Sequence, residues 1–334
     1  MTYNKSMKLL QCHDKQMWDD YVIEHGGHPL QMWGWGDVKT AHNWQAHRLF
    51  LHDSSDEVVG SAQILVRHLP WPLKSLSYIP RGPIVDDENR EQMLSLLVKY
   101  AKSTYKSVAL TIEPDSEEYS VPKGWVKSKS HILQSNTIIL DLTKSTEDLM
   151  KVMDPNTRRY IRRFEAGEAV VKKINNREGL NDCLAVYHQT ARRARFNLHD
   201  DQYYYDIFDK MGENSVLYIA YVDEKPVAFL WLAISAETAY ELYGGMTEEG
   251  RKLNASYGLK WHAISKSKEW GLARYDFGGM IDGGVTAFKK AWDSKQTVLA
   301  GTFDYPFSIY YSLWINGLPF AKSIIRRIKA VIGR

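Results

Sequence analysis

A lysine that follows two glycine pairs is the feature of this sequence best suited to chemistry. Residues 274–277 are β-prone and aromatic, which predicts a short strand. The glycines at 278–279 let the backbone turn without a Cβ penalty, and a second pair at 283–284 precedes Phe288 and Lys289. This order places a cation near the end of a strand. The simpler interpretation is a glycine-rich turn followed by a solvated lysine pair.

Four arginines form a second group of interest, because they recur at helical spacing. Arg158, Arg159, Arg162 and Arg163 are expected to share one basic face of a helix. The formal net charge of the chain is only +3, so a polyanionic partner has to bind a local patch of this kind. The alternative is a helix face that is merely solvated.

Length and composition are those of an ordinary globular protein. The chain has 334 residues, which corresponds to about two domains, and 44% of them are hydrophobic. Cys12 and Cys183 lie far apart and show no metal or disulfide spacing, which suits a reducing compartment and predicts no metal site. The sequence shows no signal peptide and no run long enough to span a membrane. We expect a cytoplasmic protein, a monomer, that uses no cofactor.

The elements that must position these residues repeat between the two halves of the chain. Each half is predicted to contain a long strand, a second strand, a helix and a buried strand, in the same order. The first half has them at residues 58–68, 75–79, 88–105 and 108–112, and the second half at 227–235, 238–244, 254–270 and 274–277. This duplication is similar to the arrangement of GNAT acyltransferases, in which a splayed mixed sheet holds an acyl donor at a helix N-terminus.

We therefore predict an α/β (α+β) chain of two tandem GNAT-like domains with mixed, splayed sheets. The first domain is expected to take residues 1–145 together with 313–334, and the second residues 146–312. Neither half has the glycine-rich loop with which GNAT domains bind coenzyme A. Before its helix, the first half offers an acidic run from Asp87, and the second offers only the late Gly258. Another activated acyl donor is therefore expected.

Six short motifs, in this order along the chain, connect the sequence to a known family. They are Trp35-Gly-Asp-Val-Lys39, Pro80-Arg-Gly-Pro-Ile84, Ile112-Glu-Pro-Asp115, Arg158-Arg-Tyr-Ile-Arg162 with Gly167 beyond it, Tyr203-Tyr204, and Tyr275-Asp-Phe-Gly-Gly279 with Phe288-Lys289. With them the chain resembles the Fem (FemABX) aminoacyltransferases over nearly its whole length. Many members carry a long helical hairpin in the second domain, and this chain resembles the compact form without it.

The resemblance implies a reaction on a cell-wall precursor. Family members transfer an amino acid from aminoacyl-tRNA to a stem-peptide amine, here expected to be a lysine side chain. The acceptor is a muramyl peptide that is either UDP-linked or lipid-linked. The product is the interpeptide bridge of peptidoglycan.

The resemblance also implies roles for residues that bind phosphate. Lys39 falls where a lysine is expected to meet the diphosphate of the precursor, with an exposed helix lysine as the alternative. His199 falls near the position of a phosphate-binding arginine in compact members. Histidine is a weaker, pH-dependent phosphate partner, so Arg193 or Arg195 is expected to compensate.

Five further positions follow from the same resemblance. Tyr203 and Tyr243 are candidate groove residues, with the hydrophobic core as the alternative. Glu113 closes a strand of the first domain, where it is expected either to hold the acceptor ammonium or to cap the strand end. Lys289, preceded by Phe288, falls at the family's Phe-Lys position and is expected to face the acyl donor.

The implied reaction demands little of protein side chains, because the donor is already an activated ester. The acceptor amine has a pKa of about 10.4, so roughly 0.04% of it is neutral at pH 7. The site must desolvate this ammonium and stabilise the tetrahedral oxyanion. No Ser-His-Asp or Cys-His arrangement is evident. We predict direct attack without an acyl-enzyme, with Lys289 as an electrostatic helper toward the oxyanion or the terminal phosphate.

Contact with tRNA requires cations but no sequence code, and the four arginines are the candidates for it. The tail, residues 307–334, mixes apolar side chains with five lysines and arginines. It is expected either to lie on anionic lipid at the inner face of the cell membrane or to pack back on the first domain.

The sequence is also compatible with two other functions. One is an N-acyltransferase of the same fold that uses another donor, such as acyl-CoA, and acts on a cell-surface polymer. The other is a non-catalytic Fem-like module that only binds the precursor or tRNA. The missing pyrophosphate loop favours tRNA as the donor carrier, and the presence of Lys39 and Lys289 argues against an inactive module.

Overall fold

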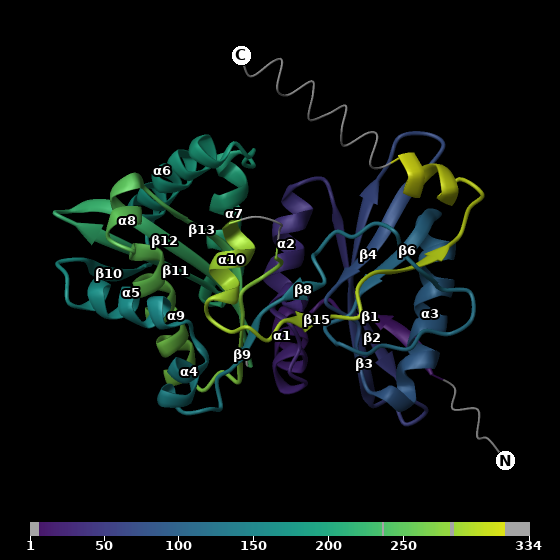
Figure 1. Ribbon diagram of the computed structural model, residues 1–334. Coiled ribbons are helices and arrows are strands. Elements are labelled where there is room, and N and C mark those ends of the chain that lie inside the picture. The colour runs from purple at the N-terminus through teal and green to yellow at the C-terminus, as the bar shows by residue number, and fades with distance from the viewer. Residues whose placement is uncertain (1–6, 236, 281–283, 318–334) are drawn as a thin grey trace. The chain divides into compact units, whose positions relative to one another are not determined.

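The computed structural model describes residues 7–235, 237–280 and 284–317, and they form two compact units (Figure 1). The first unit takes the described residues within 1–18, 39–133 and 299–334, and the second those within 19–38 and 134–298. These bounds differ from the boundaries expected at 145 and 312. The C-terminal bound differs because strand β16 (Phe303–Pro306) pairs with strand β6 (Ser107–Glu113) of the first unit. The bound near residue 134 differs because strand β9 (Ile139–Asp141) pairs with strand β14 (Arg274–Asp276) of the second unit.

The first unit is built on an eight-stranded mixed sheet. Its strand order is β1-β2-β3-β4-β6-β16-β7, with β5 paired to β3. The remaining strands are β1 (Lys8–Gln11), β2 (Gln45–His52), β3 (Val58–His68), β4 (Ser75–Pro80), β5 (Ile84–Val85) and β7 (Val126–Lys127). Strands β4 and β6 run parallel, and the other pairs of this sheet run antiparallel.

Helix α3 (Asp87–Tyr105) supplies the apolar layer on this sheet. Met93, Leu94, Leu97 and Ala101 repeat at helical spacing and are fully buried in the core of the unit. The helix ends where Lys106 adopts a left-handed conformation. Helices α1 (Lys15–Glu24) and α2 (Trp33–Ala41), with the 3-10 turn η1 (Pro29–Gln31) between them, contain the points where the chain passes between the units.

The second unit has a six-stranded sheet in the order β10-β11-β12-β13-β14-β9. The strands are β9 (Ile139–Asp141), β10 (Val170–Ile174), β11 (Ser215–Val222), β12 (Lys225–Ile234), β13 (Thr238–Met246) and β14 (Arg274–Asp276). Strands β13 and β14 run parallel, and the other pairs run antiparallel. A separate ribbon joins β8 (Asn136–Thr137) to β15 (Thr297–Val298).

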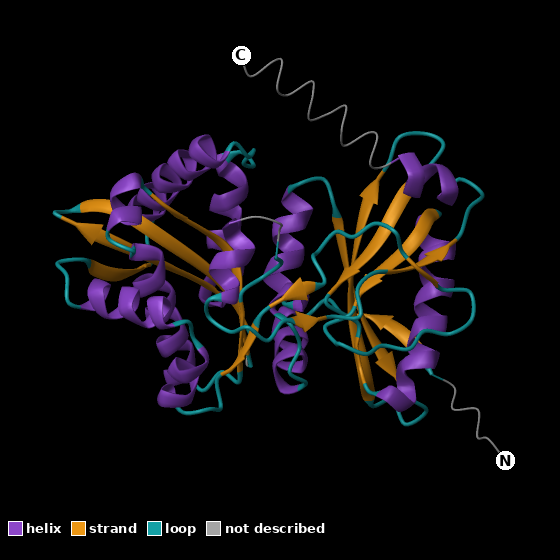
Figure 2. Ribbon diagram, viewed as in Figure 1, coloured by secondary structure: helices purple, strands orange, loops and turns teal. Residues whose placement is uncertain are grey.

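Helices cover both faces of the second sheet (Figure 2). Helices α5 (Pro155–Glu165) and α9 (Ala255–Glu269) lie on one face, and α6 (Arg177–Ala194) lies on the other (Figure 1). The remaining helices are α4 (Thr146–Val152), α7 (Asp201–Met211), the 3-10 turn η2 (Gly212–Asn214), α8 (Glu248–Lys252) and α10 (Gly284–Lys290). One core cluster of the unit joins residues of α5 and α9 to apolar side chains of the sheet.

Both units contain the repeat predicted from the sequence. In the first, the antiparallel pair β3–β4 is followed by α3 and by β6, which lies parallel to β4. In the second, the antiparallel pair β12–β13 is followed by α9 and by β14, which lies parallel to β13. The predicted class, a mixed α/β chain of two similar units, is confirmed.

Candidate functional site

The candidate site lies where the parallel strands β13 and β14 of the second unit separate. They pair from Thr238 and Arg274 to Tyr240 and Asp276, and β14 then ends while β13 continues. Gly278 turns the chain with a φ of +68°, and a Cβ there would lie 2.9 Å from the carbonyl oxygen of Glu241. A residue with a side chain does not fit this close approach, so the glycine sets the path of the turn.

Lys289 fixes this turn from α10. Its ammonium donates hydrogen bonds to the carbonyl oxygens of Phe277, Gly278 and Gly279 at 2.5, 3.1 and 2.9 Å. These three bonds use all its donors. The side chain is 9% exposed, so the alternative of a solvated lysine pair is wrong for Lys289, although Lys290 is exposed. Burial lowers the pKa of Lys289, and the charges of Glu241 and Asp276 oppose that shift.

A buried ion pair beside this turn was not predicted from the sequence. The ammonium of Lys260 on α9 lies 2.6 and 2.7 Å from the two carboxylate oxygens of Glu241 on β13. The hydroxyl of Tyr275 donates to the same carboxylate at 2.9 Å. Lys260 also lies over the ring of Phe277, 4.2 Å from its centroid.

Burial lowers the pKa of Lys260 to about 8, and the attraction of Glu241 offsets only part of that effect. A buried group with a strongly perturbed pKa and a specific charged partner is a marker of functional sites. Glu241, Lys260 and Lys289 therefore form one charged cluster around the turn at 277–279. Phe288 closes the cluster from α10, with its ring 5.2 Å from the Lys260 ammonium.

The predicted residues His199, Tyr203 and Tyr243 lie together in the same unit. His199 stacks on Tyr203 with ring centroids 4.1 Å apart. Tyr243 on β13 contacts Tyr204 and Tyr187 with centroids at 5.3 and 5.7 Å. Burial raises the pKa of Tyr203 to about 12 and that of Tyr243 well above its usual value. This aromatic packing favours the core interpretation for Tyr203, which is buried, whereas Tyr243 is partly exposed and His199 is exposed at the edge of the group.

Two predicted residues belong to the first unit. Lys39 lies in the last turn of α2 and is partly buried. Burial lowers its pKa to about 8, and the neighbouring charge of Arg67 adds to the shift. Glu113 is 1% exposed and accepts hydrogen bonds from Tyr78, Thr302 and the backbone N–H groups of residues 132 and 133. These donors favour the strand-end role over capture of an ammonium.

The arginine cluster lies on α5, and one member differs from the others. Arg159, Arg162 and Arg163 are exposed. Arg158 is partly buried and donates to the carbonyl oxygens of Met150 and Met153 at the end of α4. Its neighbour Thr157 is buried, so the helix turns Arg158 toward the protein. Three of the four arginines thus remain available to a polyanion.

Among the described residues, no group of three or more His, Cys, Asp or Glu side chains is arranged to hold a metal ion. Within the same ranges, no helix combines the length and the apolar character needed to cross a bilayer. Residues 318–334, which make up most of the tail discussed above, lie outside the described residues.

The two sheets and the strand pair β13–β14, which separates at the turn, define the class of the fold, which is GNAT-like. The family model of the acetyltransferase (GNAT) domain matches residues 153–290, and that of the FemAB family matches residues 14–129. A solved structure of FemX superposes with a TM-score of 0.80 at 21% identity, over 90% of this chain and 97% of that chain.

Curated relatives point the same way. The lipid II:glycine glycyltransferase of Staphylococcus epidermidis is 23% identical over 381 aligned positions, which cover 87% of this chain and 91% of the relative. The enzyme of the same name from Staphylococcus aureus is also 23% identical, over 86% of this chain and 90% of the relative. The FemAB model, the glycyltransferase relatives and the FemX structure together support the Fem family for this chain, and the relatives support a transferase. The 381 aligned positions exceed this chain's 334 residues, so the relative carries inserted residues, in agreement with the compact form.

Proposed function

We propose that this protein transfers an amino acid from aminoacyl-tRNA to the lysine side chain of the stem peptide in a lipid-linked muramyl peptide. The product is an interpeptide bridge of peptidoglycan. The observation that carries the proposal is the near full-length match to enzymes named lipid II:glycine glycyltransferases. Their name favours the lipid-linked acceptor over the UDP-linked one.

The start of helix α9 supports tRNA as the carrier of the donor. In the coenzyme A-binding form of this fold, a glycine-rich loop opens that helix and binds pyrophosphate through its backbone N–H groups. Here the short helix α8 occupies residues 248–252, and Asn254 precedes α9 without a side-chain cap. An acyl-CoA-dependent transferase is the alternative, and the match to the GNAT domain model supports it through the fold alone.

The charged cluster gives the reaction its electrostatics. The acceptor amine attacks the ester carbonyl, a C–N bond forms, the C–O bond to the tRNA breaks, and the proton lost by nitrogen leaves with that oxygen. In our proposal Lys289 acts on the oxyanion or the terminal phosphate through its positive charge and not as a hydrogen-bond donor, because its three N–H groups already bind carbonyl oxygens. Its three carbonyl contacts hold it in place beforehand, so little reorganisation is needed in the transition state. The Glu241–Lys260 pair positions the turn that Lys289 holds.

The two sides of the reaction would be divided between the units. Lys39 of the first unit binds the diphosphate of the acceptor, and the exposed arginines of α5 in the second unit bind the tRNA backbone. Glu113 closes its strand and holds the neighbouring loop.

One incubation tests the reaction. The protein is mixed with a charged-tRNA pool and, separately, with the UDP-linked and the lipid-linked muramyl peptide, and the stem peptide is analysed by mass spectrometry. We expect a mass increase of one aminoacyl residue on the lipid-linked acceptor, and none after deacylation of the tRNA. Transfer that proceeds from acyl-CoA and not from aminoacyl-tRNA would contradict the proposal.

A further inference from the structure

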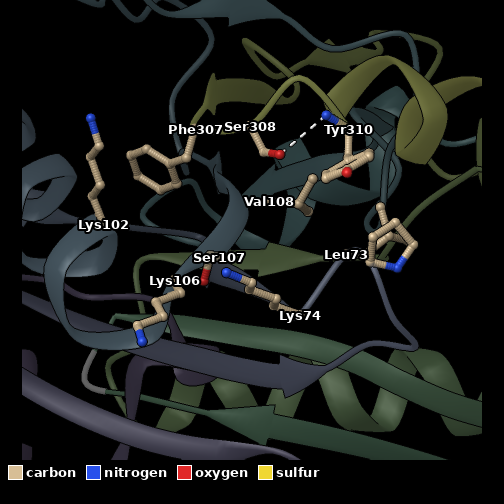
Figure 3. Close-up of a pocket in the computed structure, with 10 residues that line it drawn as sticks. Leu73, Lys74, Lys102, Lys106, Ser107, Val108, Phe307, Ser308 and Tyr310 are labelled. Atoms are coloured by element: carbon tan, nitrogen blue, oxygen red, sulfur yellow. Dashed lines mark hydrogen bonds between the residues drawn. The ribbon is translucent and has the colours of Figure 1, made fainter.

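The first unit contains a cavity for which the proposed reaction gives no use. It measures about 240 Å³ and lies at the starts of strands β4 and β6, where the chain also leaves β16. Lys74, Lys102 and Lys106 line it, together with the hydroxyl-bearing residues Ser107 and Ser308 (Figure 3). None of the described residues that line it is acidic.

The positive charge extends beyond the cavity to the segments that form it. Residues 66–76, 99–109 and 305–317 contain five lysines and arginines and no aspartate or glutamate. In the part of the chain that the structure describes, Lys74, Lys102 and Lys106 have no ion-pair partner. Lys102 and Lys106 also suit the C-terminal end of α3, but Lys74 lies in a loop and has no such role. The cluster is therefore suited to an anionic partner.

Large apolar side chains stand in solvent next to these lysines. Trp71 and Ile309 are each 89% exposed, and each is the chain neighbour of a residue that lines the cavity. Leu313, one helical turn after Ile309, is 57% exposed. Two apolar side chains this exposed beside residues that line one cavity, with a third on the segment that leaves it, indicate a contact surface rather than scattered surface residues.

The direction of these side chains is set by packing beneath them. Tyr311 and Trp314 belong to the same segment as Ile309 and Leu313, and they pack on a small core that includes Leu76 and Val108. One face of this segment, with Tyr311 and Trp314, is therefore packed on the protein, and the other face, with Ile309 and Leu313, is exposed to solvent.

We propose that this surface, formed by the lysine cavity with Trp71, Ile309 and Leu313, docks the protein on a bilayer that contains anionic phospholipids. The lysines bind lipid phosphates, and the tryptophan and aliphatic side chains enter the boundary between headgroups and acyl chains. Free phosphate would satisfy the lysines and leave the apolar side chains in water. An RNA strand could stack on Trp71 but would not cover Ile309 and Leu313. An anionic bilayer accommodates both parts of the surface.

The proposal stands apart from the transfer reaction, because binding to vesicles requires neither tRNA nor acceptor. The full-length protein is floated with vesicles of phosphatidylcholine alone, or of equal parts phosphatidylcholine and phosphatidylglycerol. We expect binding only to the anionic vesicles, and weaker binding as salt increases. Lys74→Ala and Lys106→Ala are each expected to lower the partition coefficient about fivefold. Trp71→Ser is expected to lower it about tenfold.

A labelling experiment reports insertion directly. Both native cysteines are buried, so a cysteine placed by Trp71→Cys or Ile309→Cys can carry an environment-sensitive fluorophore selectively. Its emission should shift to the blue with anionic vesicles, whereas the label at Val170→Cys, an exposed position of the second unit, should not respond.

Three outcomes would overturn the docking surface. One is vesicle binding that survives the Lys74, Lys106 and Trp71 substitutions but is lost in the full-length variant Arg326→Glu/Arg327→Glu, which would assign the membrane contact to residues 318–334. A second outcome is that the protein binds inorganic phosphate, depending on Lys74, but does not bind anionic vesicles. The third is a lysine variant that loses affinity for tRNA and keeps its affinity for vesicles.

Discussion

The two units place a tyrosine and a glutamate across their parallel strand pairs, but they treat the carboxylate differently. In the first unit, Tyr78 of β4 donates to Glu113 of β6, and in the second, Tyr275 of β14 donates to Glu241 of β13. The strands that supply the two residues are thus exchanged. Glu113 is otherwise satisfied by neutral donors, whereas Glu241 holds the ammonium of Lys260.

This difference indicates that the carboxylate of Glu113 is structural, whereas that of Glu241 serves to hold a charge. Neutral hydrogen bonds complete Glu113 at modest cost. Burying the Glu241–Lys260 pair costs desolvation energy on both partners, and apolar residues could fill the same volume at no such cost. The second unit keeps this pair and buries a third charge, on Lys289, beside it. For this reason we place the reacting centre in the second unit.

The largest expected effect comes from neutralising each of the two carboxylates in turn. Glu241→Gln leaves Lys260 buried without a counter-ion, and we expect a loss of about 3–5 kcal/mol in the free energy of unfolding at pH 7. Glu113→Gln retains a hydrogen-bonding side chain, and we expect a loss of about 1–3 kcal/mol. Urea unfolding of both variants provides the measurement. Equal losses would mean that the two carboxylates do the same work.

The pH dependence of Glu241→Gln provides a control. The folded-state pKa of Lys260, about 8, lies below its unfolded value, so the unfolded chain binds more protons between the two values and stability from this group rises with pH. In the variant the attraction of Glu241 is lost and the pKa of Lys260 falls further, so the variant should regain part of its stability as the pH rises toward the unfolded-state pKa of lysine. The double variant Glu241→Gln/Lys260→Met should regain it at pH 7 as well, because no unpaired charge remains.

The second test concerns chemistry at the charged cluster. Lys289→Met removes the fixed cation, and we expect single-turnover transfer to fall by roughly two orders of magnitude. Some stability should be lost too, because Lys289 is buried and holds three carbonyl groups. Lys290→Met, at the exposed neighbouring position, is the matched control and should retain full activity. A folded Lys289→Met protein with normal transfer would remove Lys289 from the mechanism.

Local sequence patterns predicted the helices and strands of the fold, but they did not predict which strands pair over long distances in the chain. The apolar spacing of α3 and the strand–strand–helix–strand repeat follow from neighbours in the sequence, and both were predicted correctly. The pairing of β16 with β6 joins residues almost two hundred positions apart, and no local pattern encodes it. The domain boundaries drawn from the sequence therefore differ from the observed units.

The candidate site shows the same limit. The glycine turn before Lys289 was visible in the sequence, but the three carbonyl acceptors that bury the lysine depend on how that turn folds back. The Glu241–Lys260 pair was missed because it joins a strand to a helix. One signal was available, since Lys260 lies on the buried face of α9 with Ala263, Ile264 and Ser267. A lysine on such a face calls for a buried partner.

The third test addresses the acceptor side of the proposed division between units. Lys39→Ala should weaken binding of the lipid-linked precursor about tenfold, with tRNA affinity unchanged. Because the pKa of Lys39 is lowered to about 8, acceptor affinity should decline as pH rises past that value. Lys39→Arg keeps its charge at all these pH values and should abolish the decline. Titration calorimetry that finds equal acceptor affinity in Lys39→Ala would leave the lysine without this role.

The smallest effect, and the sharpest distinction within one helix, concerns the arginines of α5. Arg159→Glu and Arg162→Glu should each weaken tRNA binding. Each variant removes one phosphate contact, so fewer counterions are released on binding and the slope of log K against log salt should be reduced by about 1. Arg158→Gln is the matched control. Its guanidinium is engaged by the carbonyl groups of Met150 and Met153, so the slope should not change. If all three variants change the slope equally, tRNA responds to the overall charge of the unit. If none does, this face of α5 is only solvated, and the donor side of the comparison must be sought elsewhere in the second unit.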